Sequence, residues 1–153
     1  MTDRDLVVEA IYRGRYVQCK KALERISSLD ENAMFHLCRN QRFLPLVKWV
    51  VKHGKTDQSL SQILYDAVCH NNLKLAGWLL KNGADVNYKG GCLLETALTL
   101  AVYSDNINVV RLLLEKGADV NEENGDGKTA LDIAREKGYD EIVRLLEGKQ
   151  GGC

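Results

Sequence analysis

The chain has 153 residues with 21 Lys and Arg side chains against 21 Asp and Glu, so it has the size of one ordinary domain and no formal net charge. Hydrophobic residues make up 45% and charged residues 27%, which argues for a buried core and against a disordered chain. No apolar run approaches the roughly 18 residues of a membrane span, and the charged opening segment lacks the apolar stretch of a signal peptide. We expect an intracellular, most simply cytoplasmic, protein without a membrane partner.

Five segments in succession repeat one pattern of two short helices. Each first helix carries a small residue, and the residues eight, nine and twelve positions later are mostly apolar, which is the spacing of one helix face. The small residues are Ala10, Cys38, Ala67, Ala101 and Ala134. We predict helix pairs near residues 3–25, 31–54, 60–83, 95–117 and 128–147. Because no pair can bury its apolar face alone, we expect them to stack in a single domain over residues 1–148, with a flexible tail at 149–153.

The turns inside these helix pairs have their own sequence signals. Four of them carry a residue that tolerates a positive φ, and only the second pair, with Arg42, departs from this pattern. The four residues are Gly14, Asn71, Asp105 and Gly138. Pro45 falls at the expected start of a second helix, where its missing N–H does no harm.

Two motifs recur in the second half of the chain. Residues 79–87 (LLKNGADVN) return as residues 113–121 (LLEKGADVN), and residues 96–101 (TALTLA) return as residues 129–134 (TALDIA). These residues resemble the ankyrin repeat. The resemblance implies an all-α ankyrin-repeat solenoid of about five stacked helix-turn-helix units. The first two spacings, 28 and 29 residues, are short, so we expect shortened β-turn fingers in the N-terminal units and full fingers only around residues 88–95 and 122–128.

No arrangement typical of a catalytic or metal site is found, so we expect no enzyme, no cofactor and no metal. Cys69 and His70 are adjacent, but neighbouring residues on a helix point about 100° apart. The histidines share no metal-ligand spacing, and the five cysteines contain no CxxC pair. We interpret Cys19 and Cys38 as small core residues, and Cys92 and Cys153 as exposed. By the resemblance, His36 forms a hydrogen bond between repeats.

The resemblance implies a protein-protein interaction module that acts as scaffold, adaptor or inhibitor and is a monomer on its own. Its partner is expected on the concave face. By the resemblance, two residues near the end of each first helix point to this face. A projecting finger adds apolar side chains: either one of its leucines folds under the next repeat, or Tyr88 and Leu93 form an exposed anchor. The candidate partner-binding residues are Tyr12, Arg13, Asn40, Gln41, Cys69, His70, Tyr88, Cys92, Leu93, Tyr103 and Ser104, and Glu136 and Lys137 take the same positions in the last unit.

Charge suggests a different kind of partner. Residues 1–58 hold 11 Lys and Arg against 7 Asp and Glu, a net charge of +4, while residues 59–153 have a net charge of −4. A basic N-terminal half is compatible with an RNA or an acidic protein, although no aromatic stacking stripe supports nucleic acid. The sequence is also compatible with an enzyme whose site has no recognisable motif and with a purely structural array.

Asn87 and Asn121 end the two copies of the repeated motif. By the resemblance, they are positions that asparaginyl hydroxylases modify in some ankyrin repeats. The simpler interpretation is that each side chain hydrogen-bonds the backbone of the finger and stabilises the turn.

Overall fold

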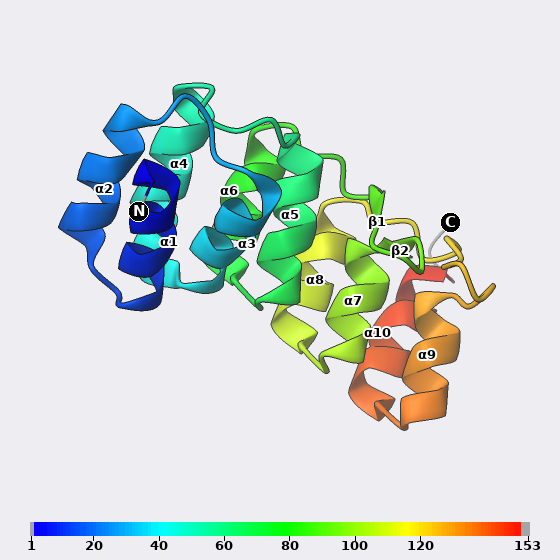
Figure 1. Cartoon of the computed structure of the whole chain (residues 1–153). Helices are drawn as coiled ribbons and strands as arrows, with labels where there is room; N and C mark the ends of the chain where they lie inside the picture. Colours follow the sequence, from blue (N-terminus) through cyan, green and yellow to red (C-terminus); the bar gives the residue numbers. More distant parts are fainter. Residues whose placement is uncertain (1, 151–153) are drawn as a thin grey trace. The chain divides into compact units, whose positions relative to one another are not determined.

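The computed structural model describes residues 2–150, which form ten α-helices, a short 3-10 helix and one two-stranded hairpin (Figure 1). The all-α prediction is therefore confirmed. The chain divides into two compact units, Met1–Ser59 and Leu60–Cys153. The predicted single domain over residues 1–148 and the count of five repeats stay predictions. None of the helices in the described part of the chain is long and apolar enough to cross a membrane.

The first unit contains two helix pairs. Its elements are α1 (Asp3–Tyr12), α2 (Tyr16–Arg25), α3 (Glu31–Arg39), the 3-10 helix η1 (Gln41–Phe43) and α4 (Leu44–Lys52). The side chains of Thr2 and Asp30 accept backbone N–H groups at the starts of α1 and α3 and so fix these ends. α1 packs against both α2 and α3, and the core between them buries Cys19 and Cys38 completely, as predicted.

The second unit contains three helix pairs and the hairpin. Its elements are α5 (Leu60–Cys69), α6 (Leu73–Lys81), β1 (Lys89–Gly90), β2 (Glu95–Thr96), α7 (Ala97–Tyr103), α8 (Ile107–Glu115), α9 (Ala130–Lys137) and α10 (Asp140–Gln150). The first helices α5, α7 and α9 pack in succession, and α8 packs against α6 and α10 (Figure 1). Each pair thus covers the apolar face of its neighbour within the unit, as in a solenoid.

The turns inside the helix pairs follow the sequence signals. Positive φ values occur at Gly14 (65°), Asn71 (54°), Asp105 (50°) and Gly138 (73°). The turn of the second pair has no such residue. The 3-10 helix η1 forms this turn instead, and it places Phe43 in the core. Pro45 lies in the first turn of α4, as predicted.

The connections between helix pairs differ in the two units. In the first unit, α2 joins α3 through a short extended segment that forms only a single parallel bridge, Leu29 to Thr56, while the Lys55 ammonium donates to the carbonyl of Ile26. In the second unit, β1 and β2 pair antiparallel, with Lys89 opposite Thr96 and Gly90 opposite Glu95. The short fingers predicted for the N-terminal units and the full finger near residues 88–95 are therefore confirmed.

Asparagine side chains hydrogen-bond backbone groups in and beside the two full fingers. Asn124 closes the second finger, since its Oδ1 accepts the backbone N–H groups of Asp126 and Lys128, each at 3.0 Å. Asn87 Oδ1 accepts the backbone N–H of Asp119 at 2.9 Å. This bond gives the Asn87 side chain a structural role, but it joins Asn87 to the next repeat and not to the backbone of its own finger.

The end of α10 requires a correction. The sequence predicts a flexible tail from residue 149, but α10 continues through Lys149 to Gln150. A single glycine such as Gly148 costs a helix only about 1 kcal/mol relative to alanine, and the residues on both sides of it are good helix formers. Residues 151–153, including Cys153, lie outside the described part of the chain.

Candidate functional site

Three of the predicted binding residues meet in one pocket of the first unit. Tyr12 ends α1, and Asn40 and Gln41 follow α3, so the packing of α1 against α3 brings them together. The pocket has a volume of about 550 Å³ and is completed by Ile11, His36 and Arg39. The Tyr12 side chain is 62% exposed. An aromatic ring is thus presented to solvent beside a polar hollow.

His36 holds Tyr12 in place. The Tyr12 hydroxyl and His36 Nε2 are 2.8 Å apart, and the two ring centroids lie 4.7 Å apart at an angle of 53°. The expectation that His36 makes a hydrogen bond between repeat units is therefore confirmed. Asn40 is also engaged locally, since its Oδ1 accepts the backbone N–H of Arg42 at 3.0 Å and fixes the start of η1.

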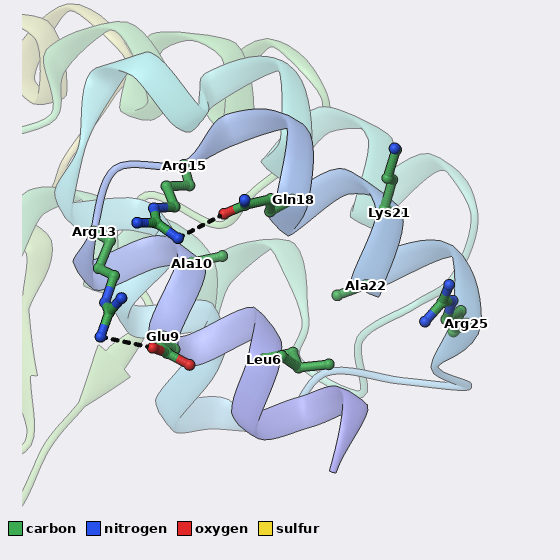
Figure 2. Close-up of a pocket in the computed structure, with 9 residues that line it drawn as sticks. All are labelled: Leu6, Glu9, Ala10, Arg13, Arg15, Gln18, Lys21, Ala22 and Arg25. Atoms are coloured by element: carbon green, nitrogen blue, oxygen red, sulfur yellow. Dashed lines mark hydrogen bonds and ion pairs between the residues drawn. The ribbon is translucent and has the colours of Figure 1, made fainter. Parts of the chain in front are cut away.

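Arg13 does not line the pocket that contains Tyr12. Its guanidinium pairs with Glu9 at 2.9 Å, and both residues line a separate pocket between α1 and α2 (Figure 2). The separation follows from helix geometry, because consecutive residues are turned about 100° around the axis. Tyr12 and Arg13, which the sequence predicts on one binding face, therefore line different pockets.

Cys69 and His70 lie at the end of α5 and are only half-buried. Burial raises the pKa of the Cys69 thiol to about 11, with the carboxylates of Asp66 and Glu95 acting in the same direction. At neutral pH the thiol therefore keeps its proton, which removes the thiolate needed for nucleophilic chemistry.

A tyrosine that the sequence did not single out supports the first full finger. Tyr65 on α5 hydrogen-bonds Glu95, and burial raises the pKa of its phenol to about 12. The finger lies against this ring so closely that a β-carbon on Gly90 would come within 3.0 Å of it. A signal was available, because Tyr65 stands two residues before Ala67, as His36 stands two residues before Cys38.

The finger tip exposes apolar side chains. Cys92 is exposed as predicted, and the exposed fractions of Leu93 and Leu94 are 48% and 56%. Tyr88 is half-buried. Because neither leucine is buried, the hypothesis in which one of them folds under the next repeat is wrong. The tip is held through its backbone, since the carbonyl of Leu93 accepts the N–H of Gly125 at 2.6 Å.

The remaining predicted residues lie at the end of α7. Tyr103 is 36% exposed, with the Lys137 ammonium 6.0 Å from its ring centroid. The Ser104 hydroxyl donates to the carbonyl of Leu100 at 3.1 Å within its own helix turn. Glu136 forms an ion pair with Lys128 at 2.8 Å. In this region Tyr103 supplies the apolar surface, while Ser104 and Glu136 are satisfied within the fold.

Within residues 2–150, no three His, Cys, Asp or Glu side chains are placed to hold a metal ion together. Among the predicted residues, Tyr12, Asn40 and Gln41 line one pocket. Leu93 at the finger tip and Tyr103 at the end of α7 are exposed in the second unit.

Comparison with known proteins gives consistent matches. Residues 91–152 match a family model described as ankyrin repeats (3 copies), and residues 64–114 match one described as ankyrin repeats (many copies). A stretch of 104 residues, 67% of the chain, is 36% identical to a protein of Oryza sativa subsp. japonica named probable E3 ubiquitin-protein ligase XBOS34. That stretch corresponds to 19% of the rice protein.

Proposed function

Because the chain belongs to the ankyrin repeat family, whose repeats generally mediate protein-protein interaction, we propose that it is a non-enzymatic module that binds a protein partner. We propose separate contacts in the two units: the Tyr12 pocket in the first, and the exposed Leu93 and Tyr103 in the second. One observation carries the proposal: large apolar and aromatic side chains are exposed at the positions where the repeat pattern places recognition residues.

Exposed leucines and tyrosines are effective anchors for a partner. Burying one leucine side chain contributes about 1.5–3 kcal/mol before losses, and about 1.4 kcal/mol changes an affinity tenfold. Tyrosine is enriched among the residues that dominate binding energy, because its ring buries a large area at a small entropic cost. Leu93 and Tyr12 therefore have the highest expected contributions.

The protonation states of Cys69 and Tyr65 argue against these two groups as nucleophiles. Burial raises the pKa values of the Cys69 thiol and the Tyr65 phenol to about 11 and about 12, so both groups stay neutral at physiological pH. Neither supplies the anion that nucleophilic catalysis needs. The relative named as a probable ubiquitin ligase adds no enzyme proposal, since the shared stretch is 19% of that protein.

The test compares the proteins captured by matched variants of the full chain. Leu93→Asp removes the proposed anchor, whereas Leu73→Asp makes the same substitution at a leucine that is 38% exposed on α6, outside the proposed surface. We expect a stoichiometric partner, identified by mass spectrometry, that is captured by the native chain and by Leu73→Asp but lost with Leu93→Asp. Thermal melts of the variants should differ little from that of the native chain.

Two results would contradict the assignment of the finger tip as a contact. If both aspartate variants capture the same proteins as the native chain, the finger tip is not a contact surface. If Leu93→Asp lowers the melting temperature by many degrees, the leucine stabilises the fold and the contact must be sought at Tyr12 alone.

A further inference from the structure

A second pocket lies in the first unit, between α1 and α2, and none of the surfaces described so far explains it (Figure 2). Its volume is about 430 Å³, within the range of roughly 300–1,000 Å³ typical of ligand sites. Leu6 and Ala10 from α1 and Ala22 from α2 supply its apolar part. The pocket therefore has room and apolar surface for side chains that belong to another molecule.

The pocket arises where the first helix pair departs from the repeat pattern. In the other four pairs, the residue eight positions after the small residue of the first helix is apolar, and the residue twelve positions after it is a valine or leucine. Each of these eight residues is at most 1% exposed. They are Leu46, Leu75, Val109 and Ile142 in the first set and Val50, Leu79, Leu113 and Leu146 in the second. The first pair has Gln18 and Ala22 instead, and both line the pocket. A hollow remains where the other pairs place larger apolar side chains.

Cations surround this hollow. Four basic side chains line it, with Glu9 as the acidic member of the lining; the basic residues are Arg13, Arg15, Lys21 and Arg25. Figure 2 shows Arg13 and Arg15 toward one end of the pocket and Arg25 toward the other. The lining thus carries excess positive charge at both ends.

Intramolecular partners neutralise only part of this charge. Arg13 pairs with Glu9 at 2.9 Å, and Arg25 lies 3.8 Å from Asp3. Arg15 donates to the neutral amide of Gln18 at 3.4 Å. Among the described residues, neither Arg15 nor Lys21 has a carboxylate within 4.0 Å. Two cations therefore remain for a carboxylate supplied from outside.

The spacing of the cations along α2 sets the size of the occupant. Arg15, Lys21 and Arg25 are separated by six and four residues, so the basic row extends about 15 Å along the helix at 1.5 Å per residue. An extended peptide covers this length with about five residues at roughly 3.3 Å each. Carboxylates at both ends of such a segment reach the two cationic ends, while a central apolar side chain enters the hollow.

We propose that the α1–α2 pocket binds an acidic protein segment in which carboxylates flank a central apolar side chain. The apolar part and the acidic Glu9 favour a protein over RNA, because RNA requires a continuous cationic track and aromatic surfaces for its bases, and the pocket has no aromatic lining. This site uses different residues from the Tyr12 pocket and the finger tip. It therefore stands independently of the proposed partner surface.

The test uses a fluorescein-labelled peptide with one central leucine flanked on each side by two acidic residues, titrated with the full chain in low salt. We expect binding with a dissociation constant on the order of 100 µM that weakens about tenfold as salt rises and screens the charges. Lys21→Glu should weaken binding at least tenfold. Lys20→Glu makes the same charge change one residue away, outside the pocket, and should change the dissociation constant less than threefold.

A filling variant separates the hollow from the charge. Ala22→Leu restores the residue type of the repeat pattern, so it should keep or raise the melting temperature and weaken peptide binding at least tenfold. If this variant fails to fold, the comparison of Lys21→Glu with Lys20→Glu decides the question alone.

Three results would overturn the proposal. Equal effects of Lys21→Glu and Lys20→Glu would show that binding follows overall charge and not the pocket. Equal affinity for an all-glutamate peptide of the same length would remove the role of the hollow. Tighter binding of a fluorescein-labelled single-stranded RNA that competes with the peptide would assign the site to nucleic acid.

Discussion

The Tyr12 hydroxyl lies 2.8 Å from Nε2 of His36 and so ties the end of α1 to α3, while 62% of the tyrosine side chain remains exposed. The residue is therefore held in one orientation without being part of the core. An anchor that is already ordered loses less side-chain entropy when a partner binds.

This arrangement predicts that Tyr12→Ala weakens partner binding at least tenfold while unfolding free energy falls by only about 1 kcal/mol, since one exposed hydrogen bond is lost. Tyr12→Phe keeps the ring and should have a smaller effect on binding. Affinity measurements and urea unfolding give both quantities. The control is Tyr16→Ala, because the Tyr16 ring stacks on the buried Phe43 with centroids 6.3 Å apart. That variant should lose stability and retain binding, and the opposite pattern would contradict the assignment of Tyr12.

The hydrogen bond of Asn87 leads to a prediction about stability. Its side chain accepts the backbone N–H of Asp119, so Asn87→Ala should lower the unfolding free energy by about 1–2 kcal/mol. Asn108→Ala, at an exposed position on α8, should change it by no more than about 0.5 kcal/mol. Urea unfolding of the two variants decides between a finger bond that stabilises the fold and one that contributes nothing.

Glu95 makes stability depend on pH. Burial raises the pKa of its carboxyl above the ordinary value of 4.5, although the hydrogen bond from Tyr65 opposes the shift. The folded chain therefore holds this proton more tightly than the unfolded chain. The contribution of Glu95 to stability is fully present below the ordinary pKa and is lost as pH rises through the raised one.

Glu95→Gln keeps an acceptor for Tyr65 but removes the ionisation. The variant should be more stable than the native chain at about pH 7, and this difference should vanish near pH 4, where Glu95 is protonated. Unfolding measured at both pH values checks the prediction, with Glu115→Gln at an exposed position as the control. A difference that stays constant with pH would show that the carboxyl is not perturbed.

The cysteines should react in a fixed order. Cys92 is exposed on the finger tip, whereas burial raises the pKa of Cys69 to about 11 and that of Cys19 to about 12. Because the thiolate is the reactive form, iodoacetamide should modify Cys92 first, Cys69 slowly, and Cys19 and Cys38 only when the chain unfolds. Mass spectrometry of peptides over time gives the four rates. Equal labelling of Cys19 and Cys92 in the folded chain would contradict the core assignment.

The parts of the fold that can be predicted from the sequence are those determined by the type of a single residue. The turn residues Gly14 and Asn71 have positive φ values because these residue types tolerate them, so their positions predict the turns. Asn40 caps η1 locally, but the burial of Phe43, whose ring stacks with that of Tyr16 on another helix, depends on a contact that the local sequence does not show. The extension of α10 past Gly148 likewise depends on a small balance of helix propensities.

The candidate sites are harder to predict from the sequence, because they depend on contacts between helices and fingers. Tyr12 and Arg13 are adjacent in the sequence, yet they line different pockets. Cys69 is half-buried near Glu95 of the following finger. Gln18 and Ala22 are visible departures from the repeat pattern, but their consequence, a hollow with a cationic rim, requires the position of α1 against α2.

Two backbone N–H groups of the later segment bond to acceptors of the earlier one, while the Lys89 ammonium donates in the opposite direction, to the carbonyl of Glu123. The backbone amides of Asp119 and Gly125 belong to the later segment. Their acceptors are Asn87 Oδ1, directly before the earlier finger, and the carbonyl of Leu93 at its tip. When the finger opens together with Asn87 before it, both amides lose their acceptors and exchange with solvent deuterium. The exchange rates of Asp119 and Gly125 therefore measure the opening of a finger that precedes them by about thirty residues, and a partner that clamps the Leu93 tip should slow both.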